Sequence, residues 1–258
     1  MGFFGRARAW RGAVVAVGMV CFAAAANARA DSVEPAGSVE VPAASAEPFG
    51  LPALAVSGGG LRAKWLGAAR KIDDERVQLA LCDGDRERCA SQAALKLLAI
   101  VDEGRASDGR ARLGQINRAI NLAINPMSDL AQYGEIDVWS SPLATFDRGA
   151  GDCEDYAIAK FVALRLAGVP ADDLRIVVLH DTLQNEDHAV AAARLDGHWL
   201  MLDNRRMAMI DDAHVRNYRP LFVIDETTVM KYLDASGVAA LPDRDAAVAT
   251  ASNAVAPQ

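Results

Sequence analysis

A single cysteine among carboxylates is the feature of this sequence best suited to covalent chemistry. Cys153 lies in the run Gly149-Ala150-Gly151-Asp152-Cys153-Glu154-Asp155-Tyr156, and His188 and Asp203 follow it in the chain. A thiol nucleophile, an imidazole base and a carboxylate that orients the base are the groups that cysteine acyl transfer needs. We therefore expect Cys153, His188 and Asp203 to form a catalytic triad.

The segment that begins at this cysteine predicts a helix that favours its reactivity. The apolar-periodic residues 153–167 are followed by Gly168-Val169-Pro170, which ends a helix. Cys153 then lies in the first turn, where free backbone N–H groups and the helix dipole stabilise a thiolate. Its own N–H can contribute to an oxyanion hole. Trp139 is a candidate for the second donor, with a purely packing role as the alternative.

A predicted β-hairpin relates the histidine to the aspartate. Asp196-Gly197 separates two β-rich runs and is a strong signal for a two-residue turn. Such a turn pairs residues whose numbers sum to 393, so Asp203 becomes the diagonal neighbour of His188 on one sheet face. Diagonal neighbours have Cα atoms about 7 to 8 Å apart. Asn204 faces the other side in this register, which disfavours a Cys-His-Asn arrangement.

The other three histidines are expected to have structural roles. His198 lies at the turn, about 17 Å from Asp203 along the strand at the usual rise per residue. His180 belongs to the preceding β-rich run, and His214 lies in a polar connector. We therefore assign the base to His188.

The carboxylates beside the thiol oppose its ionisation and need an explanation. Asp152, Glu154 and Asp155 either complement the helix dipole or are neutralised by a cation. Oxygen ligands clustered within four residues suit Ca²⁺ better than a soft metal. Asp152 and Glu154 are the best candidate ligands, with Asp155 behind them, although the chain has no EF-hand pattern.

The first thirty residues are typical of a secretory signal peptide. Arg6, Arg8 and Arg11 precede the apolar stretch 12–26, and Ala28-Arg29-Ala30 offers a cleavage site. The apolar stretch is shorter than the roughly 20 residues that span a membrane, and an uncleaved anchor is the alternative. We expect a cleavable signal and a periplasmic protein.

One folded domain, at 61–234, is expected between two flexible ends. Residues 31–60 are rich in Ala, Pro, Ser and Gly, as linkers are, and 235–258 form an Ala-rich tail that we expect to be disordered. Removal of residues 1–30 takes the net charge from −7 to −11. This charge disfavours nucleic acid as a partner.

The remaining cysteines suit an oxidising compartment. Cys82 and Cys89 flank a short polar loop, and we expect them to form a disulfide that clamps a helix-loop-helix corner. Cys153 is then the unpaired thiol of the exported chain. Its polar neighbours argue against an inert buried cysteine.

The order of the expected elements predicts an α+β fold. Apolar periodicity predicts helices over 61–81, 92–103 and 110–124 before the one at 153–167. The β-rich runs 174–180, 188–195, 198–204 and 218–224 follow, and short connections make their sheet antiparallel.

Several motifs together resemble a known family. The runs GDCEDYAIAK (151–160), DHAV (187–190) and LDN (202–204) are similar to motifs of the bacterial transglutaminase-like cysteine proteinases, as are WSSPL (139–143) and NRAIN (117–121). The resemblance covers about residues 70–225. It implies a papain-like, transglutaminase-like core with N-terminal helices packed on an antiparallel sheet and the catalytic Cys153 at a helix N-terminus.

The resemblance also implies a ligand and partners. The best-known branch of this family is periplasmic and depends on calcium, carried by the carboxylates at the positions of Asp152 and Glu154. Its members release cells from biofilm by clipping the N-terminal module of a large surface adhesin, and an inner-membrane receptor for cyclic di-GMP restrains them. No organic cofactor is expected.

Peptide hydrolysis through a thioester is therefore the leading functional hypothesis, with a protein as the substrate of this cysteine endopeptidase. Transglutaminase-type acyl transfer is the enzymatic alternative, because an amine can resolve the same thioester. A non-catalytic envelope module that binds peptides is the third hypothesis, and it predicts a missing or misplaced triad member.

Overall fold

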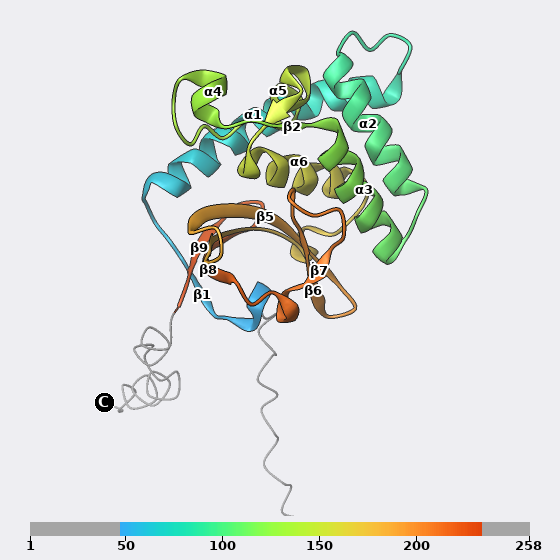
Figure 1. The fold of residues 1–258 in the computed structure, drawn as a ribbon. Coiled ribbons are helices and arrows are strands. Elements are labelled where there is room, and N and C mark those ends of the chain that lie inside the picture. Colours follow the sequence, from blue (N-terminus) through green and yellow to red (C-terminus); the bar gives the residue numbers. More distant parts are fainter. Residues whose placement is uncertain (1–46, 234–258) are drawn as a thin grey trace, which may run out of the picture. The chain divides into compact units, whose positions relative to one another are not determined.

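Helices occupy the first half of the chain and strands most of the second half in this computed structural model, which describes residues 47–233 (Figure 1). The α-helices are α1 (Gly60–Gly84), α2 (Gln92–Arg105), α3 (Gly109–Ala123), α4 (Asp129–Tyr133), α5 (Pro142–Arg148) and α6 (Cys153–Leu166). Three 3₁₀ turns accompany them, η1 (Pro48–Gly50), η2 (Ala171–Asp173) and η3 (Asp212–His214).

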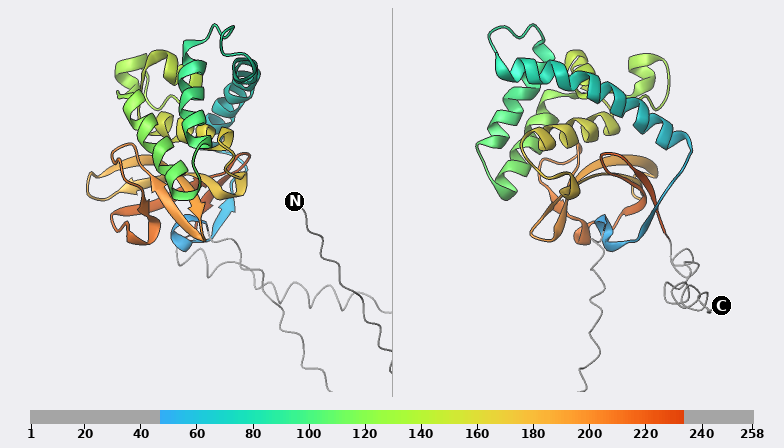
Figure 2. Two further views of the ribbon diagram at one scale, coloured as in Figure 1. Left: turned by 90° about the vertical axis from the view of Figure 1, so that its right-hand side faces the viewer. Right: turned by 180° about the vertical axis from the view of Figure 1, so that it is seen from behind.

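Seven strands form one antiparallel sheet, and all but β1 (Ala53–Ala55) come from the second half of the chain. The spatial order of the sheet is β1, β9 (Val229–Tyr232), β8 (Tyr218–Ile224), β4 (Leu174–Asp181), β5 (Glu186–Leu195), β6 (His198–Leu202) and β7 (Ile210–Asp211). The helices gather on one face of this sheet (Figures 1 and 2). The α+β prediction is confirmed.

Helix α6 is the centre of the core. Every residue from Glu154 to Leu164 is buried, which is the pattern of a helix surrounded by protein. It lies between the sheet and the outer helices (Figure 1) and contacts β5 on the sheet side and α3 on the other. The β5 alanines at 189, 191 and 193 join its core cluster, and such small side chains let the helix lie close to the strand.

The predicted β5–β6 hairpin is present with the predicted register. Asp196 and Gly197 both have positive φ, 52° and 82°, as a two-residue type I′ turn requires. Leu195 pairs with His198 and Ala191 with Leu202. Strand β6 ends at Leu202, so the following aspartate begins a loop instead of extending the strand.

The amino-terminal boundary of the domain differs from the prediction. Residues 47–60 were assigned to a flexible linker, but Ala53–Ala55 form the edge strand β1, which pairs with β9. Glu47 also forms an ion pair with Arg175, with the Oε2–Nε distance at 2.7 Å. These long-range pairs outweigh the linker-like composition. The predicted signal peptide, the rest of the linker and the tail lie outside the described residues.

A second, two-stranded sheet was not predicted. Strands β2 (Asn125–Pro126) and β3 (Ala150–Gly151) pair in parallel and bring the end of α3 beside the segment before α6. Among the described helices, none is long and apolar enough to cross a membrane.

Candidate active site

Two glycines shape the approach to the cysteine. Gly149 ends α5 with φ 70°, in the left-handed region that favours glycine. A Cβ on Gly151 would lie 2.8 Å from the Cβ of Asp155, so only glycine fits there. The chain then enters α6 with Cys153 as its first residue, which confirms the predicted helix start.

The thiol of Cys153 faces a carboxylate in this structure. It is partly buried and donates to Glu154 Oε2 over 3.1 Å. Burial raises the pKa of the Cys153 thiol, and the charge and hydrogen bond of Glu154 raise it further, while the backbone N–H of Ala189 opposes them. The protonated thiol is therefore the favoured form in this structure.

His188 and Asp203 form a buried, directed pair at the end of the hairpin. His188 Nε2 lies 3.0 Å from Asp203 Oδ1, and both side chains are almost fully buried. With an ionised carboxylate as acceptor, Nε2 carries the proton and Nδ1 is left as the base. Nδ1 is buried and has no hydrogen-bond partner. An imidazole held in this way can accept a proton at one defined atom.

The Asp203 carboxylate is stabilised in its ionised form. Burial raises its pKa, but hydrogen bonds from His188, from the Tyr218 hydroxyl and from the Arg205 backbone N–H outweigh burial and hold the pKa below its usual range. Tyr218 also packs against the His188 ring with a centroid distance of 6.1 Å. Sequence reasoning did not identify Tyr218 as part of the site.

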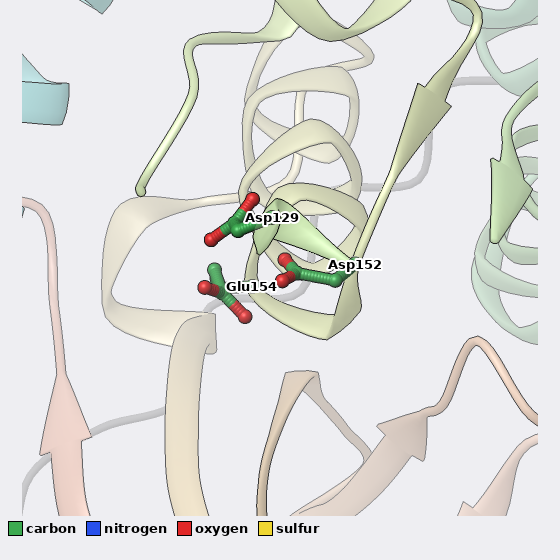
Figure 3. A group of neighbouring side chains, drawn as sticks. All are labelled: Asp129, Asp152 and Glu154. Carbon is green, nitrogen blue, oxygen red and sulfur yellow. The ribbon is translucent and has the colours of Figure 1, made fainter. Parts of the chain in front are cut away.

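Three carboxylates gather at the start of α6, and two of them belong to the chain neighbours of Cys153 (Figure 3). Ligand atoms of Asp129, Asp152 and Glu154 all lie within 4.8 Å of one another. Burial raises the pKa of Asp152 to about 9, and the charge of Glu154 adds to this effect. One oxygen each of Asp129 and Asp152 is buried without a hydrogen-bond partner. Crowded, unsatisfied oxygens of this kind are suited to a hard cation such as calcium.

The expected third ligand, Asp155, does not join this cluster. Its Oδ1 accepts from the backbone N–H of Ser140 over 2.9 Å, and the side chain is fully buried. Burial raises the pKa of Asp155 to about 7. Successive residues on a helix point about 100° apart, so Asp155 points away from the side that Glu154 occupies.

Asp129 takes the place that sequence reasoning gave to Asp155. It begins α4, shortly after β2, and the parallel β2–β3 pair brings it beside the cysteine motif. No spacing rule links it to the motif, and a pairing of two residues per strand is too short to predict.

Trp139, the candidate oxyanion donor, is a packing residue that is already hydrogen-bonded. Its Nε1–H donates to Asp137 Oδ1 over 2.9 Å, and its ring meets that of Trp65 edge-on at 6.5 Å. The indole N–H is therefore not free for an oxyanion. The alternative interpretation, packing, fits this residue.

The remaining histidines lie beside acidic side chains other than Asp203. His180 Nδ1 lies 3.0 Å from Asp187, while His198 and His214 approach Asp211 at 3.4 and 3.9 Å.

The predicted disulfide is present. Cys82 and Cys89 join the end of α1 to the loop before α2. Cys153 is the free cysteine of the described chain.

A buried lysine lies behind the His188–Asp203 pair and was also missed. Lys160 is fully buried in α6, and its Nζ donates to the carbonyl oxygen of Leu202 over 3.0 Å. Burial lowers the pKa of Lys160 to about 7, while the charge of Asp203 opposes this shift.

This lysine should make stability depend on pH above neutrality. Its folded pKa of about 7 lies below the unfolded value, so between the two the unfolded chain binds one more proton and stability rises with pH. Relative to Lys160→Met, the free energy of unfolding of the wild type should therefore rise above pH 7, by up to about 1.4 kcal/mol per pH unit. Urea unfolding of both proteins across this range measures it. A constant difference would show that Lys160 does not titrate as inferred.

Comparison with known proteins places the chain in a family. The family model for bacterial transglutaminase-like cysteine proteinases matches residues 77–224. A solved structure of Legionella pneumophila LapG is similar, with 22% identity, a TM-score of 0.50 and coverage of 68% of this chain and 96% of that chain. The calcium-bound LapG structure has 21% identity and a TM-score of 0.50, and the match covers 71% and 99%. A search of the curated proteins finds no match.

Proposed function

This chain belongs to the bacterial transglutaminase-like cysteine proteinases, and we propose that it is a calcium-dependent cysteine endopeptidase with Cys153, His188 and Asp203 as its triad. The family makes it a cysteine peptidase with a protein substrate. The observation that carries the triad is the buried His188–Asp203 hydrogen bond of 3.0 Å, which leaves Nδ1 without a partner.

In the proposed reaction His188 accepts one proton and gives it back in each half-reaction. His188 Nδ1 takes the proton of Cys153, and the thiolate attacks the carbonyl carbon of the scissile peptide bond. His188 returns that proton to the leaving amine as the C–N bond breaks, which leaves a thioester on Cys153. Water, deprotonated by His188, then releases the acid and restores the thiol. Asp203 holds the imidazole tautomer and stabilises the imidazolium throughout.

Calcium is assigned to Asp129, Asp152 and Glu154. Their crowded oxygens, two of them unsatisfied, support this assignment, and a structure of LapG carries calcium. When bound, the ion supplies positive charge that offsets the carboxylates opposing thiol ionisation. Glu154, which accepts the thiol hydrogen bond in this structure, then has a second partner for its charge.

The compartment and the partners belong to the same proposal. Residues 1–30 are typical of a signal peptide, and the Cys82–Cys89 disulfide suits the oxidising periplasm. The family resemblance supports a large surface adhesin, cut in its N-terminal region, as the substrate. It also supports an inner-membrane receptor for cyclic di-GMP as the regulator.

A cleavage assay on envelope proteins of the producing cell tests this proposal. Wild-type protein and Cys153→Ala are each incubated with calcium or with a chelator, and new fragments are identified by mass spectrometry. We expect fragments only with wild-type protein and calcium. Fragments that persist in the chelator would refute calcium dependence, and fragments that persist in Cys153→Ala would refute the assigned nucleophile.

A labelled primary amine in the same assay separates hydrolysis from acyl transfer. We expect new carboxyl termini without incorporated amine, because water resolves the thioester. Substrate that incorporates the amine at a rate comparable to cleavage would favour the transglutaminase-type alternative.

A further inference from the structure

The loop that carries Asp203 is held by side chains from two helices. Residues 203–209 follow β6 without regular secondary structure, so backbone pairing with a neighbouring strand does not fix them. A carboxylate on such a loop keeps its position only if something else fixes the backbone. Helices α3 and α6 lie next to each other above this part of the sheet (Figure 1) and supply the contacts.

Two asparagines on one face of α3 bind the backbone of this loop. Asn121 Nδ2 donates to the carbonyl oxygens of Asp203 and Arg206 over 3.0 and 2.9 Å. Asn117, one turn earlier, donates to those of Arg206 and Met207 over 3.3 and 3.2 Å. Each amide nitrogen has two hydrogens, and both are directed to the loop.

Lys160 holds the same backbone from α6. Its buried ammonium group donates to the carbonyl oxygen of Leu202, the residue before Asp203. Together with Asn117 and Asn121 it forms what we call the carbonyl clamp. The clamp binds the backbone on both sides of Asp203, while His188, Tyr218 and the Arg205 N–H bind its carboxylate.

The clamp is costly to bury. The Oδ1 atoms of Asn117 and Asn121 are buried without hydrogen-bond partners, and the ionisable amino group of Lys160 is fully buried. Unsatisfied polar atoms and buried charges lower stability, and apolar side chains of similar volume would pack such a site without these costs. The polar side chains of the clamp are therefore better explained by their hydrogen bonds to the backbone around Asp203 than by a contribution to stability.

We propose that Asn121 and Lys160 are positioning residues that act through Asp203, by fixing its backbone so that its carboxylate stays on His188 Nε2. This inference rests on the proposed function, because it needs the triad. Small displacements of a catalytic group are expensive, and a misplacement of about 1 Å can cost about 100-fold.

A double-mutant cycle on thiol reactivity tests the inference without a known substrate. The second-order rate constant for alkylation of Cys153 by iodoacetamide is measured in calcium at about pH 6, where a free thiol is almost fully protonated. The proteins are wild type, Asn121→Ala, Asp203→Asn and the double variant. Asn121 is only partly buried, so its replacement leaves the core intact.

We expect Asn121→Ala to lower the rate constant at least about tenfold in the wild type and to have little further effect in Asp203→Asn. Equal fold losses in both backgrounds would mean that Asn121 supports the fold in general, which would overturn the inference. If the rate constant of Asp203→Asn equals that of the wild type, the proposed triad is wrong, and the role of the carbonyl clamp is refuted with it.

Arg112→Ala is the matched control. Arg112 lies on the same helix and donates from its side chain to the carbonyls of Gly104 and Ser107, away from Asp203. We expect it to lower thermal stability and leave the rate constant unchanged. Lys160→Met repeats the cycle from α6, in case Asn121→Ala does not fold, and the same non-additivity with Asp203→Asn is expected.

Discussion

Replacing Cys153 by serine is expected to lower kcat/KM for peptide cleavage by at least about 10⁴-fold, as removal of the nucleophile does in other hydrolases. A hydroxyl has a far higher pKa than a thiol, so the proposed base, His188, would deprotonate serine far less readily than cysteine. The fold should be unaffected, because a serine hydroxyl is close in size to the thiol and can keep the hydrogen bond to Glu154. Rates on a peptide taken from the identified cleavage site, with thermal unfolding of both proteins, measure this.

The paired cysteines provide the control for this variant. Joint replacement of Cys82 and Cys89 by serine removes the disulfide at the α1–α2 corner, which should cost about 2 to 4 kcal/mol of unfolding free energy. Its kcat/KM should stay near that of the wild type. A Cys153→Ser protein that retained even a tenth of the activity would contradict the assigned nucleophile.

Asp129→Asn is expected to abolish most calcium binding, with a loss of affinity of at least about tenfold. The substitution removes one of the three carboxyl groups from the cluster and keeps the shape of the side chain. Calcium at 100 times its dissociation constant should stabilise the wild type by about 2.7 kcal/mol, and this gain should largely disappear in the variant. Isothermal titration calorimetry and thermal unfolding, each with and without calcium, measure the two effects.

Asp155→Asn is the matched control for the calcium site. Asp155 is close to the cluster in sequence, but its carboxylate binds the Ser140 N–H. Its pKa of about 7 means that it is partly protonated near neutral pH, so an amide is a tolerable replacement. We expect nearly unchanged calcium affinity. The opposite outcome, with affinity lost in Asp155→Asn and kept in Asp129→Asn, would contradict the cluster.

Local rules predicted the elements that position the cysteine and the histidine. The start of α6 follows from apolar periodicity, and Asp196-Gly197 sets a hairpin whose register has a period of two, so both could be read along the chain. The register ends at the Ala191–Leu202 pair, which brings the chain close to His188, but Asp203 itself lies in the loop that follows. Short-range patterns therefore predict that the two residues approach each other and do not predict the contacts that fix Asp203.

Contacts between distant segments could not be predicted in the same way. Asp129 reaches the site through a two-residue parallel pair, and β1 joins the sheet by pairing with the last strand. The asparagines of α3 look like polar residues on an ordinary amphipathic helix until the loop after β6 is placed against them. Such contacts depend on the tertiary arrangement, which no periodicity in one segment encodes.

The structure also explains how a thiol surrounded by acids can belong to an enzyme. Without a cation, burial and Glu154 raise the pKa of the Cys153 thiol, which keeps it protonated. The proposed calcium site includes Glu154, so metal binding and thiol ionisation are coupled through one carboxylate. This coupling is the physical basis for expecting activity only in the presence of calcium.

Alkylation of Cys153 by iodoacetamide at about pH 6, followed by intact mass, shows whether this thiol is activated. With calcium present, we expect one adduct, on Cys153, formed at least about tenfold faster than on a free cysteine, because an imidazolium beside the sulfur would stabilise the thiolate. A rate no faster than that of free cysteine, unchanged by calcium and by His188→Ala, would contradict an activated thiol at this site.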